Sequence, residues 1–259
     1  MKGFIAASIA GAVLASSSAF AADMGIAPNA PPPVNWSGCY VAGGVGYGLW
    51  KQNSTTEATA GLTPLSNTIS FGGEGWLGRV GGGCDYQTPL FGGRLVIGGF
   101  ADYDFMNVNG QSQDPLTGYI GTENESGSWA VGGRVGYLVI PGLLGFFDAG
   151  YTGARFDQIN LGTLAPPPAA VGLSIPAQTY SGWFLGSGYE YALGSVVPIA
   201  GLFWRTEYRF ASYQTANVPI VVTATGAPFG LTDRVQKDVQ TITSGLVWRF
   251  NWWGGPTMQ

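Results

Sequence analysis

The chain has 259 residues and a formal net charge of −4, and only 10% of its residues are charged while 14% are aromatic. Soluble domains carry roughly 25% charged residues, so we expect few residues of this chain to face water. The slightly acidic balance also argues against nucleic acid as a partner, and we predict none.

Histidine is absent from the sequence. Without an imidazole base the chain cannot form a Ser–His or Cys–His nucleophilic pair, and two cysteines alone do not make a structural zinc site. Asp102 and Asp104 share one face of a predicted strand and form a candidate acid–base pair, but pairing with interior arginines is the simpler interpretation. We therefore predict no enzyme activity, no catalytic residue, no cofactor and no metal.

The first residues are typical of a secretory signal peptide. Lys2 supplies the positive start, residues 4–15 the apolar run and residues 19–22 a small-residue cleavage site. The apolar run is shorter than the roughly 20 residues of a membrane-spanning helix, which disfavours the alternative of an uncleaved anchor. The predicted parts are a signal peptide over 1–22, a proline-rich periplasmic linker over 23–37, an outer-membrane β-barrel over 38–250 and a short tail over 251–259.

After the signal peptide, no apolar run approaches the length of a spanning helix. Only helices and closed barrels satisfy their backbone groups in lipid, so a membrane-embedded chain of this kind must be a barrel. Apolar and polar residues alternate in eight segments: 38–51, 72–86, 94–106, 128–140, 145–156, 180–192, 199–212 and 237–250. We predict an all-β fold, a transmembrane antiparallel up-and-down β-barrel of eight strands.

The connections between these segments differ in length. Three are tight (87–93, 141–144 and 193–198) and four are long and polar (52–71, 107–127, 157–179 and 213–236). This pattern predicts periplasmic turns, periplasmic N- and C-termini and extracellular loops. Aromatic girdles are expected at both rims, with one formed by Trp36, Tyr86, Phe91 and Trp248 and the other by Trp50, Trp76 and Trp129.

Charged residues fall mainly on one parity of the predicted strands. Six arginines and six carboxylates are therefore expected inside the barrel: Arg79, Asp85, Arg94, Asp102, Asp104, Arg134, Asp148, Glu190, Arg205, Glu207, Arg209 and Arg249. Buried charges must be paired, and an eight-stranded barrel is just wide enough for side chains to fill. We predict an ion network that plugs the lumen; the alternative is a narrow ion path along it.

The two cysteines lie on adjacent predicted strands. If Lys51 pairs with Gly72 across the first long loop, counting back along both strands places Cys39 opposite Cys84. Directly opposed residues have Cα atoms close enough for a disulfide, and the predicted compartment is oxidising. We predict a disulfide between them; the alternative is two unpaired thiols at the lipid edge.

The segment Trp36-Ser37-Gly38-Cys39-Tyr40-Val41-Ala42-Gly43-Gly44 resembles the opening strand of a known family. It is similar to the small outer-membrane β-barrel proteins of alphaproteobacteria, the outer-membrane immunogenic or opacity-like porin family. Residues 81–87, 182–192 and 241–250 resemble the family's second, sixth and closing strands. One departure is that the family ends on the aromatic residue of its last strand, whereas nine residues follow Phe250 here.

The resemblance implies a role in envelope integrity and surface interaction, performed through the extracellular loops. The alternative function is a small-solute porin with a narrow path through the barrel. The expected partners are outer-membrane lipid and lipopolysaccharide, the barrel-assembly machinery, and a host or surface ligand at the loops.

Overall fold

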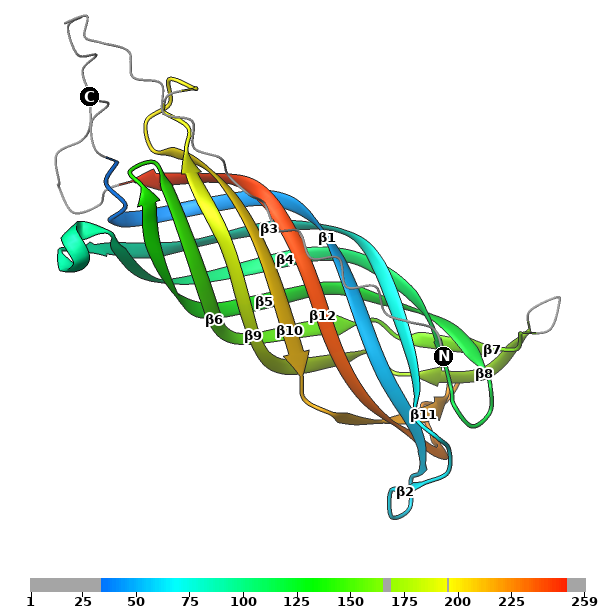
Figure 1. Ribbon diagram of the computed structural model, residues 1–259. Coiled ribbons are helices and arrows are strands. Elements are labelled where there is room, and N and C mark those ends of the chain that lie inside the picture. Colours follow the sequence, from blue (N-terminus) through cyan, green and yellow to red (C-terminus); the bar gives the residue numbers. More distant parts are fainter. Residues whose placement is uncertain (1–33, 165–168, 195, 251–259) are drawn as a thin grey trace, which may run out of the picture. The chain divides into compact units, whose positions relative to one another are not determined.

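The computed structural model describes residues 34–164, 169–194 and 196–250. The predicted signal peptide, the linker up to residue 33 and the tail lie outside these residues. Within them, eight strands form a closed ring in chain order, and the last strand pairs with the first (Figure 1). The strands are β1 (Gly38–Ala58), β3 (Ile69–Thr88), β4 (Leu95–Gln113), β5 (Ile120–Ile140), β6 (Leu143–Phe156), β9 (Gln178–Ala192), β10 (Leu202–Tyr213) and β12 (Pro228–Phe250). The predicted up-and-down barrel of eight antiparallel strands is confirmed.

The barrel has two unlike ends. At one, here called the turn end, short connections join β3 to β4 through the 3-10 turn η1 (Leu90–Gly93), β5 to β6, and β9 to β10. The other, the loop end, carries the long connections together with the short strands β2 (Thr63–Pro64), β7 (Ile159–Gly162), β8 (Ala170–Ile175) and β11 (Ala216–Val222). No helix among the described residues is long and apolar enough to cross a membrane.

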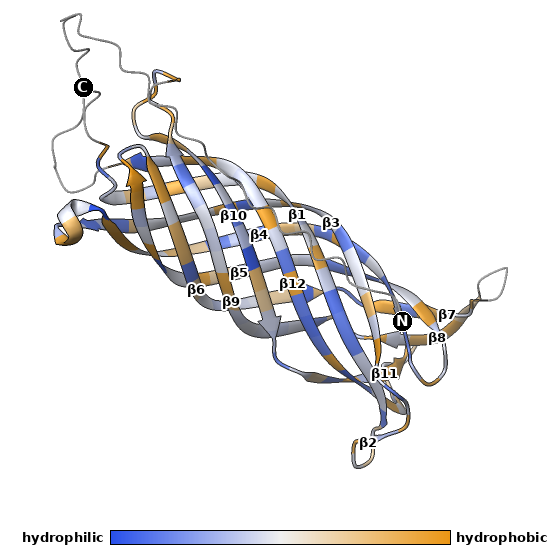
Figure 2. Cartoon of the chain, viewed as in Figure 1, coloured by the Kyte–Doolittle hydropathy of each residue, from blue (hydrophilic) through white to orange (hydrophobic). Residues whose placement is uncertain are grey.

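The outer surface near the turn end is an apolar band. Along the strands, exposed aliphatic and aromatic side chains alternate with buried or half-buried ones. Figure 2 shows hydrophobic and hydrophilic positions interspersed along these strands. Many of the outward side chains are large and exposed, such as Val45 at 66% and Phe147 at 70%. In water such a surface would be unstable, and in lipid it is the surface that a barrel requires.

The band ends abruptly toward the loop end. On each strand of the ring its last outward-facing member is Leu49, Trp76, Phe105, Trp129, Tyr151, Trp183, Phe210 or Ile242. Beyond these residues the outward positions are small or polar, and they include Lys51, Glu74, Asn107, Asn124, Arg155, Ser181, Ser212 and Gln240. The exposed Trp76 and Trp129 lie at this border, as predicted for a girdle.

Beyond the band the strands continue instead of opening into loops, and we call this part the loop-end extension. β1 runs on to Ala58, β4 to Gln113, and β12 already begins at Pro228. Its interior holds an apolar core that includes Val108, Phe156, Ile175, Ile220 and Val235, together with buried polar side chains such as Glu123, Asp233 and Lys237. A polar outer surface around an apolar core is typical of a barrel part that faces water. Much of the four predicted loops is therefore regular strand.

The extension closes its own ring with different strands. β6 and β10 end near the border, and β7, β8 and β11 take the places of β6, β9 and β10. β5 pairs with β7, β7 with β8, β8 with β11, and β11 with β12. The ring β1–β3–β4–β5–β7–β8–β11–β12 is thereby complete.

Candidate functional site

The lumen within the apolar band holds two groups of paired charges. The turn-end charge cluster consists of Asp85, Arg134, Glu190, Arg205 and Arg249, and the mid-barrel charge cluster of Arg79, Asp102, Asp104, Glu207 and Arg209. Because strand residues alternate between faces, these side chains share the inward parity of their strands. The structure thus brings together ten of the twelve charged residues expected inside.

The turn-end charge cluster is centred on two carboxylates. Glu190 accepts from Arg134 at 3.2 Å, from Arg205 at 2.9 Å and from Arg249 at 2.6 Å. Asp85 binds Arg249 at 2.6 Å and the Arg134 guanidinium through both of its oxygens. Neither carboxylate has an exposed side-chain surface. Each is held by at least two guanidinium groups, which offsets the cost of its burial.

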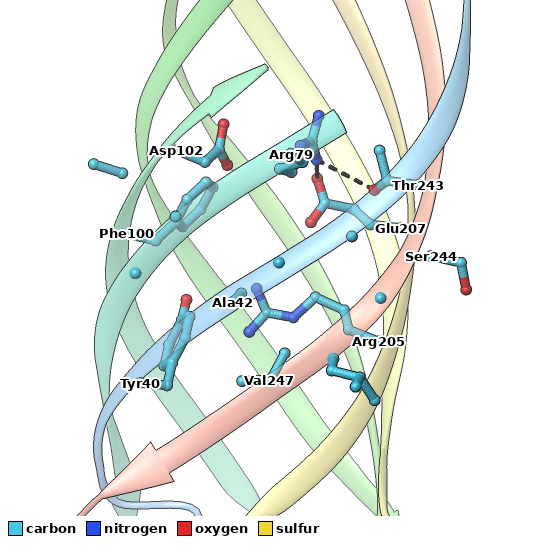
Figure 3. Close-up of a pocket in the computed structure, with 17 residues that line it drawn as sticks. Tyr40, Ala42, Arg79, Phe100, Asp102, Arg205, Glu207, Thr243, Ser244 and Val247 are labelled. Atoms are coloured by element: carbon cyan, nitrogen blue, oxygen red, sulfur yellow. Dashed lines mark hydrogen bonds and ion pairs between the residues drawn. The ribbon is translucent and has the colours of Figure 1, made fainter. Parts of the chain in front are cut away.

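The mid-barrel charge cluster is built in the same way around two arginines. Arg79 binds Asp104 through two bonds of 2.7 and 2.8 Å, and Arg209 binds Asp102 through two bonds of 2.9 and 2.8 Å. Glu207 joins them. Its Oε1 accepts from Arg79 Nη1 at 2.7 Å, as Figure 3 shows, and from Arg209 Nε at 3.0 Å. Bidentate pairs of this kind fix the orientation of each side chain as well as its charge.

Aromatic rings pack against the guanidinium groups inside the barrel. The guanidinium carbon of Arg205 lies 4.6 Å from the centre of the Tyr40 ring, and that of Arg209 lies 4.5 Å from the Phe184 ring. A cation over a ring face is attracted by the electron density of the ring. Both rings and ion pairs therefore occupy the lumen.

Two predicted members of the network lie elsewhere. Arg94 is exposed and follows η1 in the turn before β4, so the expectation that it points into the lumen is wrong, and Asp85 lies opposite Gly98 on β4. Asp148 is buried opposite Arg134 on the neighbouring strand, but among the described residues no ion pair reaches it and its Oδ1 has no hydrogen-bond partner.

Trp36 closes the turn end of the lumen. Its side chain is fully buried, its ring lies 4.8 Å from that of Phe203, and its backbone oxygen accepts from Arg249 at 3.2 Å. Its backbone NH donates to Gln87 at 3.1 Å. The prediction that Trp36 belongs to an outer girdle is wrong, because the chain turns inward before β1 begins.

Sequence reasoning missed a third set of charges, inside the loop-end extension. Lys237 donates to Glu123 at 2.6 Å and also binds Gln52, with its ammonium 4.0 Å from the centre of the Phe156 ring. Nearby Glu125 is fully buried, and neither of its oxygens has a hydrogen-bond partner within the described part of the chain. Burial in this apolar interior raises the pKa of Glu125 to about 8, although Lys237 opposes the change.

The two cysteines form the predicted disulfide. β1 and β3 pair with Lys51 opposite Gly72 and Cys39 opposite Cys84, and the two sulfur atoms are bonded. The bridge joins the first two strands of the ring at the turn end, on the outer surface. The predicted strand register is confirmed along the whole hairpin.

The two charge clusters neutralise each other's buried charges and occupy the lumen. The described residues contain no group of three or more potential metal-ligating side chains placed to bind an ion. The sequence allows two interpretations of Asp102 and Asp104, as an acid–base pair or as partners of interior arginines. The contacts favour the second interpretation, because an arginine binds both oxygens of each carboxylate.

Comparison with known proteins gives related outer-membrane proteins. The 31 kDa outer-membrane immunogenic protein of Brucella melitensis is 28% identical over 206 residues, covering 75% of this chain and 82% of that protein. The protein of the same name from Brucella suis matches equally well. No family model matches the chain.

Solved outer-membrane barrels also align with the structure. Neisserial surface protein A gives a TM-score of 0.39 at 13% identity, covering 83% of this chain and 98% of that one. The outer-membrane protein AlkL gives a TM-score of 0.41 at 12% identity, covering 90% and 100%. The resemblance predicted from the sequence motifs is confirmed by the two Brucella proteins.

Proposed function

The chain is homologous to outer-membrane immunogenic proteins of Brucella, and on that premise we propose a non-enzymatic role in envelope integrity and surface interaction. The main support for this proposal is that the two halves of the barrel are built differently. The half within the apolar band has a packed lumen, and the other half is built as a second closed ring beyond the band. A barrel of this design presents a rigid platform above the membrane.

The proposal includes the orientation and processing of the chain. The signal peptide 1–22 is removed and residues 23–37 form a periplasmic linker. The barrel then inserts with its turn end and both termini in the periplasm and its loop end outside. Lipopolysaccharide and the assembly machinery are the expected envelope partners, and a surface ligand contacts the loop end.

The porin alternative needs an open path through the lumen. Trp36 at the turn end, two charge clusters and the apolar core of the extension all lie across that path. This packing supports a closed barrel.

Conductance of the refolded protein in planar bilayers tests the choice, with a wide porin in the same bilayers as positive control. We expect no stepwise conductance. Regular steps comparable to those of the control would favour the porin and contradict our proposal.

A complementation experiment separates the two parts of the role. Cells lacking the protein are compared with cells carrying the wild type or a chain whose turns 59–62 and 223–227 are replaced by Gly-Ser. We expect the replaced chain to restore resistance to detergent and to lose surface binding. Full surface binding by that chain would contradict a role for the loop end.

A further inference from the structure

A small chamber lies in the lumen between the two charge clusters. Its volume is about 40 Å³, and its lining includes Tyr40, Arg79, Asp102, Arg205 and Glu207 (Figure 3). Glycines of β1, β3 and β12 form much of its wall, so no other side chains fill it. A cavity of this size is large enough for one or two water molecules.

Polar atoms at the chamber lack protein partners. The Tyr40 hydroxyl is buried and has no hydrogen-bond partner among the described residues. Arg205 uses only Nε and Nη2, both on Glu190, and its side chain keeps 15% of its surface accessible inside the barrel. Glu207 accepts both of its arginine bonds on Oε1. Donors and an acceptor therefore remain available around one small space.

The charges on either side of the chamber have opposite sign. The turn-end charge cluster contains three arginines and two carboxylates, which leaves one positive charge. The mid-barrel charge cluster contains two arginines and three carboxylates, which leaves one negative charge. A cation in the chamber would be repelled by the turn-end charge cluster, and an anion would be repelled by the mid-barrel charge cluster. A small neutral dipole is attracted by both.

We propose that the chamber is a structural water site, in which one or two water molecules join Arg205 and Tyr40 to Glu207. The water oxygen accepts from Arg205, and its hydrogens point toward Glu207 and the Tyr40 oxygen. The two clusters then form one continuous hydrogen-bonded column. The site does not depend on the proposed function, because it holds for any folded state of this barrel.

Filling the chamber with carbon tests the proposal. Ala42 faces the chamber, and Ala42→Val adds two methyl groups there. In a dry cavity the added methyls gain contacts and raise the Tm. In a water site they displace water and leave polar groups unsatisfied, so we expect the Tm of the refolded barrel to fall by roughly 5 °C. An unchanged or raised Tm would overturn the proposal.

Ala149→Val is the matched control, because Ala149 faces outward on β6 and is exposed. We expect its Tm to equal that of the wild type. A direct measurement on the wild type covers the case in which Ala42→Val does not fold. A crystal structure grown with bromide should show water density within hydrogen-bond distance of Arg205 Nη1 and the Tyr40 hydroxyl. An anomalous bromide peak there, or an empty chamber, would contradict the water site.

Discussion

Cys39 and Cys84 lie directly opposite each other on β1 and β3, and their disulfide closes the first hairpin of the barrel at its turn end. The two cysteines are 45 residues apart, and the chain between them runs to the loop end along β1 and returns along β3. On the other side, Cys39 pairs with Phe250, the last described residue of β12. The bridge therefore lies beside the seam at which the ring closes.

We expect protein isolated from cells and denatured without reductant to take up no alkylating reagent, as measured by mass. Replacing both cysteines with serine should lower the free energy of unfolding by up to about 4 kcal/mol, because the loop is no longer closed in the unfolded chain. Two alkylated cysteines in the cell-derived protein would refute the bridge.

Arg134→Ala should destabilise the barrel by about 3–5 kcal/mol, because it leaves Asp85 and Glu190 with fewer partners in a buried setting. The measurement is urea unfolding of the refolded protein in detergent. Arg94→Ala is the matched control: Arg94 is exposed, so its removal should leave the unfolding curve unchanged. Equal curves for the two variants would refute a stabilising role for the turn-end charge cluster.

Glu125→Gln should stabilise the loop-end extension at alkaline pH. Burial raises the pKa of Glu125 from 4.5 to about 8, so the folded state binds its proton more tightly than the unfolded chain does. The parent chain therefore loses stability as the pH rises from about 4.5 to about 8, and the variant avoids this loss. The difference should reach at most about 5 kcal/mol, since one pKa unit corresponds to about 1.4 kcal/mol.

Unfolding of the parent and variant at pH 5, 7 and 9 measures this difference. Glu74→Gln, at an exposed position just beyond the apolar band, is the control and should show no pH-dependent gain. If the curves of Glu125→Gln and the parent stay parallel from pH 5 to pH 9, Glu125 is ionised in the folded protein and its assignment here is wrong.

Protease added to intact cells should cut at the turns of the loop end, such as 59–62, 114–119 and 223–227. These residues are not in strands, whereas the segments beside them are paired in β1, β4, β5, β11 and β12. Mass spectrometry of the fragments locates the cuts. Cuts confined to 89–94 or 141–142 would mean that the turn end faces outward.

The first hairpin could be predicted in full because one rule covers it. Alternation with period two continues unbroken along β1 and β3, so a single assumed pair, Lys51 with Gly72, fixed every other pair including the cysteines. The same rule places Trp50 inside, since it shares the parity of Tyr40. We nevertheless expected Trp50 in an outer aromatic girdle. That prediction was wrong, because the Trp50 side chain is buried.

Other positions could not be reached by counting. β4 and β5 pair irregularly between Phe105 and Val108, and β5 and β6 pair irregularly between Glu125 and Gly127. Such bulges change which parity faces inward, and this brings Glu123 and Glu125 into the lumen. Arg94 shows the same difficulty at a turn: η1 and its cap extend the connection by one residue, so the strand begins at Leu95.

The twelve charged residues illustrate what parity can and cannot decide. It indicates which side chains enter the lumen, and ten of them meet in two clusters. It does not indicate partners across the barrel, because strand tilt brings Arg79 of β3 to Glu207 of β10. Asp148 lies next to Arg134 along the sheet, yet the Arg134 side chain extends to Asp85 and Glu190 instead.

In the proposed orientation, the second ring limits where a foreign peptide can be carried on the outside of a cell. An insertion at residues 52–58 would interrupt a strand that is paired with β12 throughout and with β3 as far as Ser54. An insertion at 59–62, 114–119 or 223–227 would interrupt no strand. As a scaffold for displayed epitopes, the barrel therefore offers short turns held between paired strands, and a peptide grafted into one would be held at a fixed distance from the apolar band.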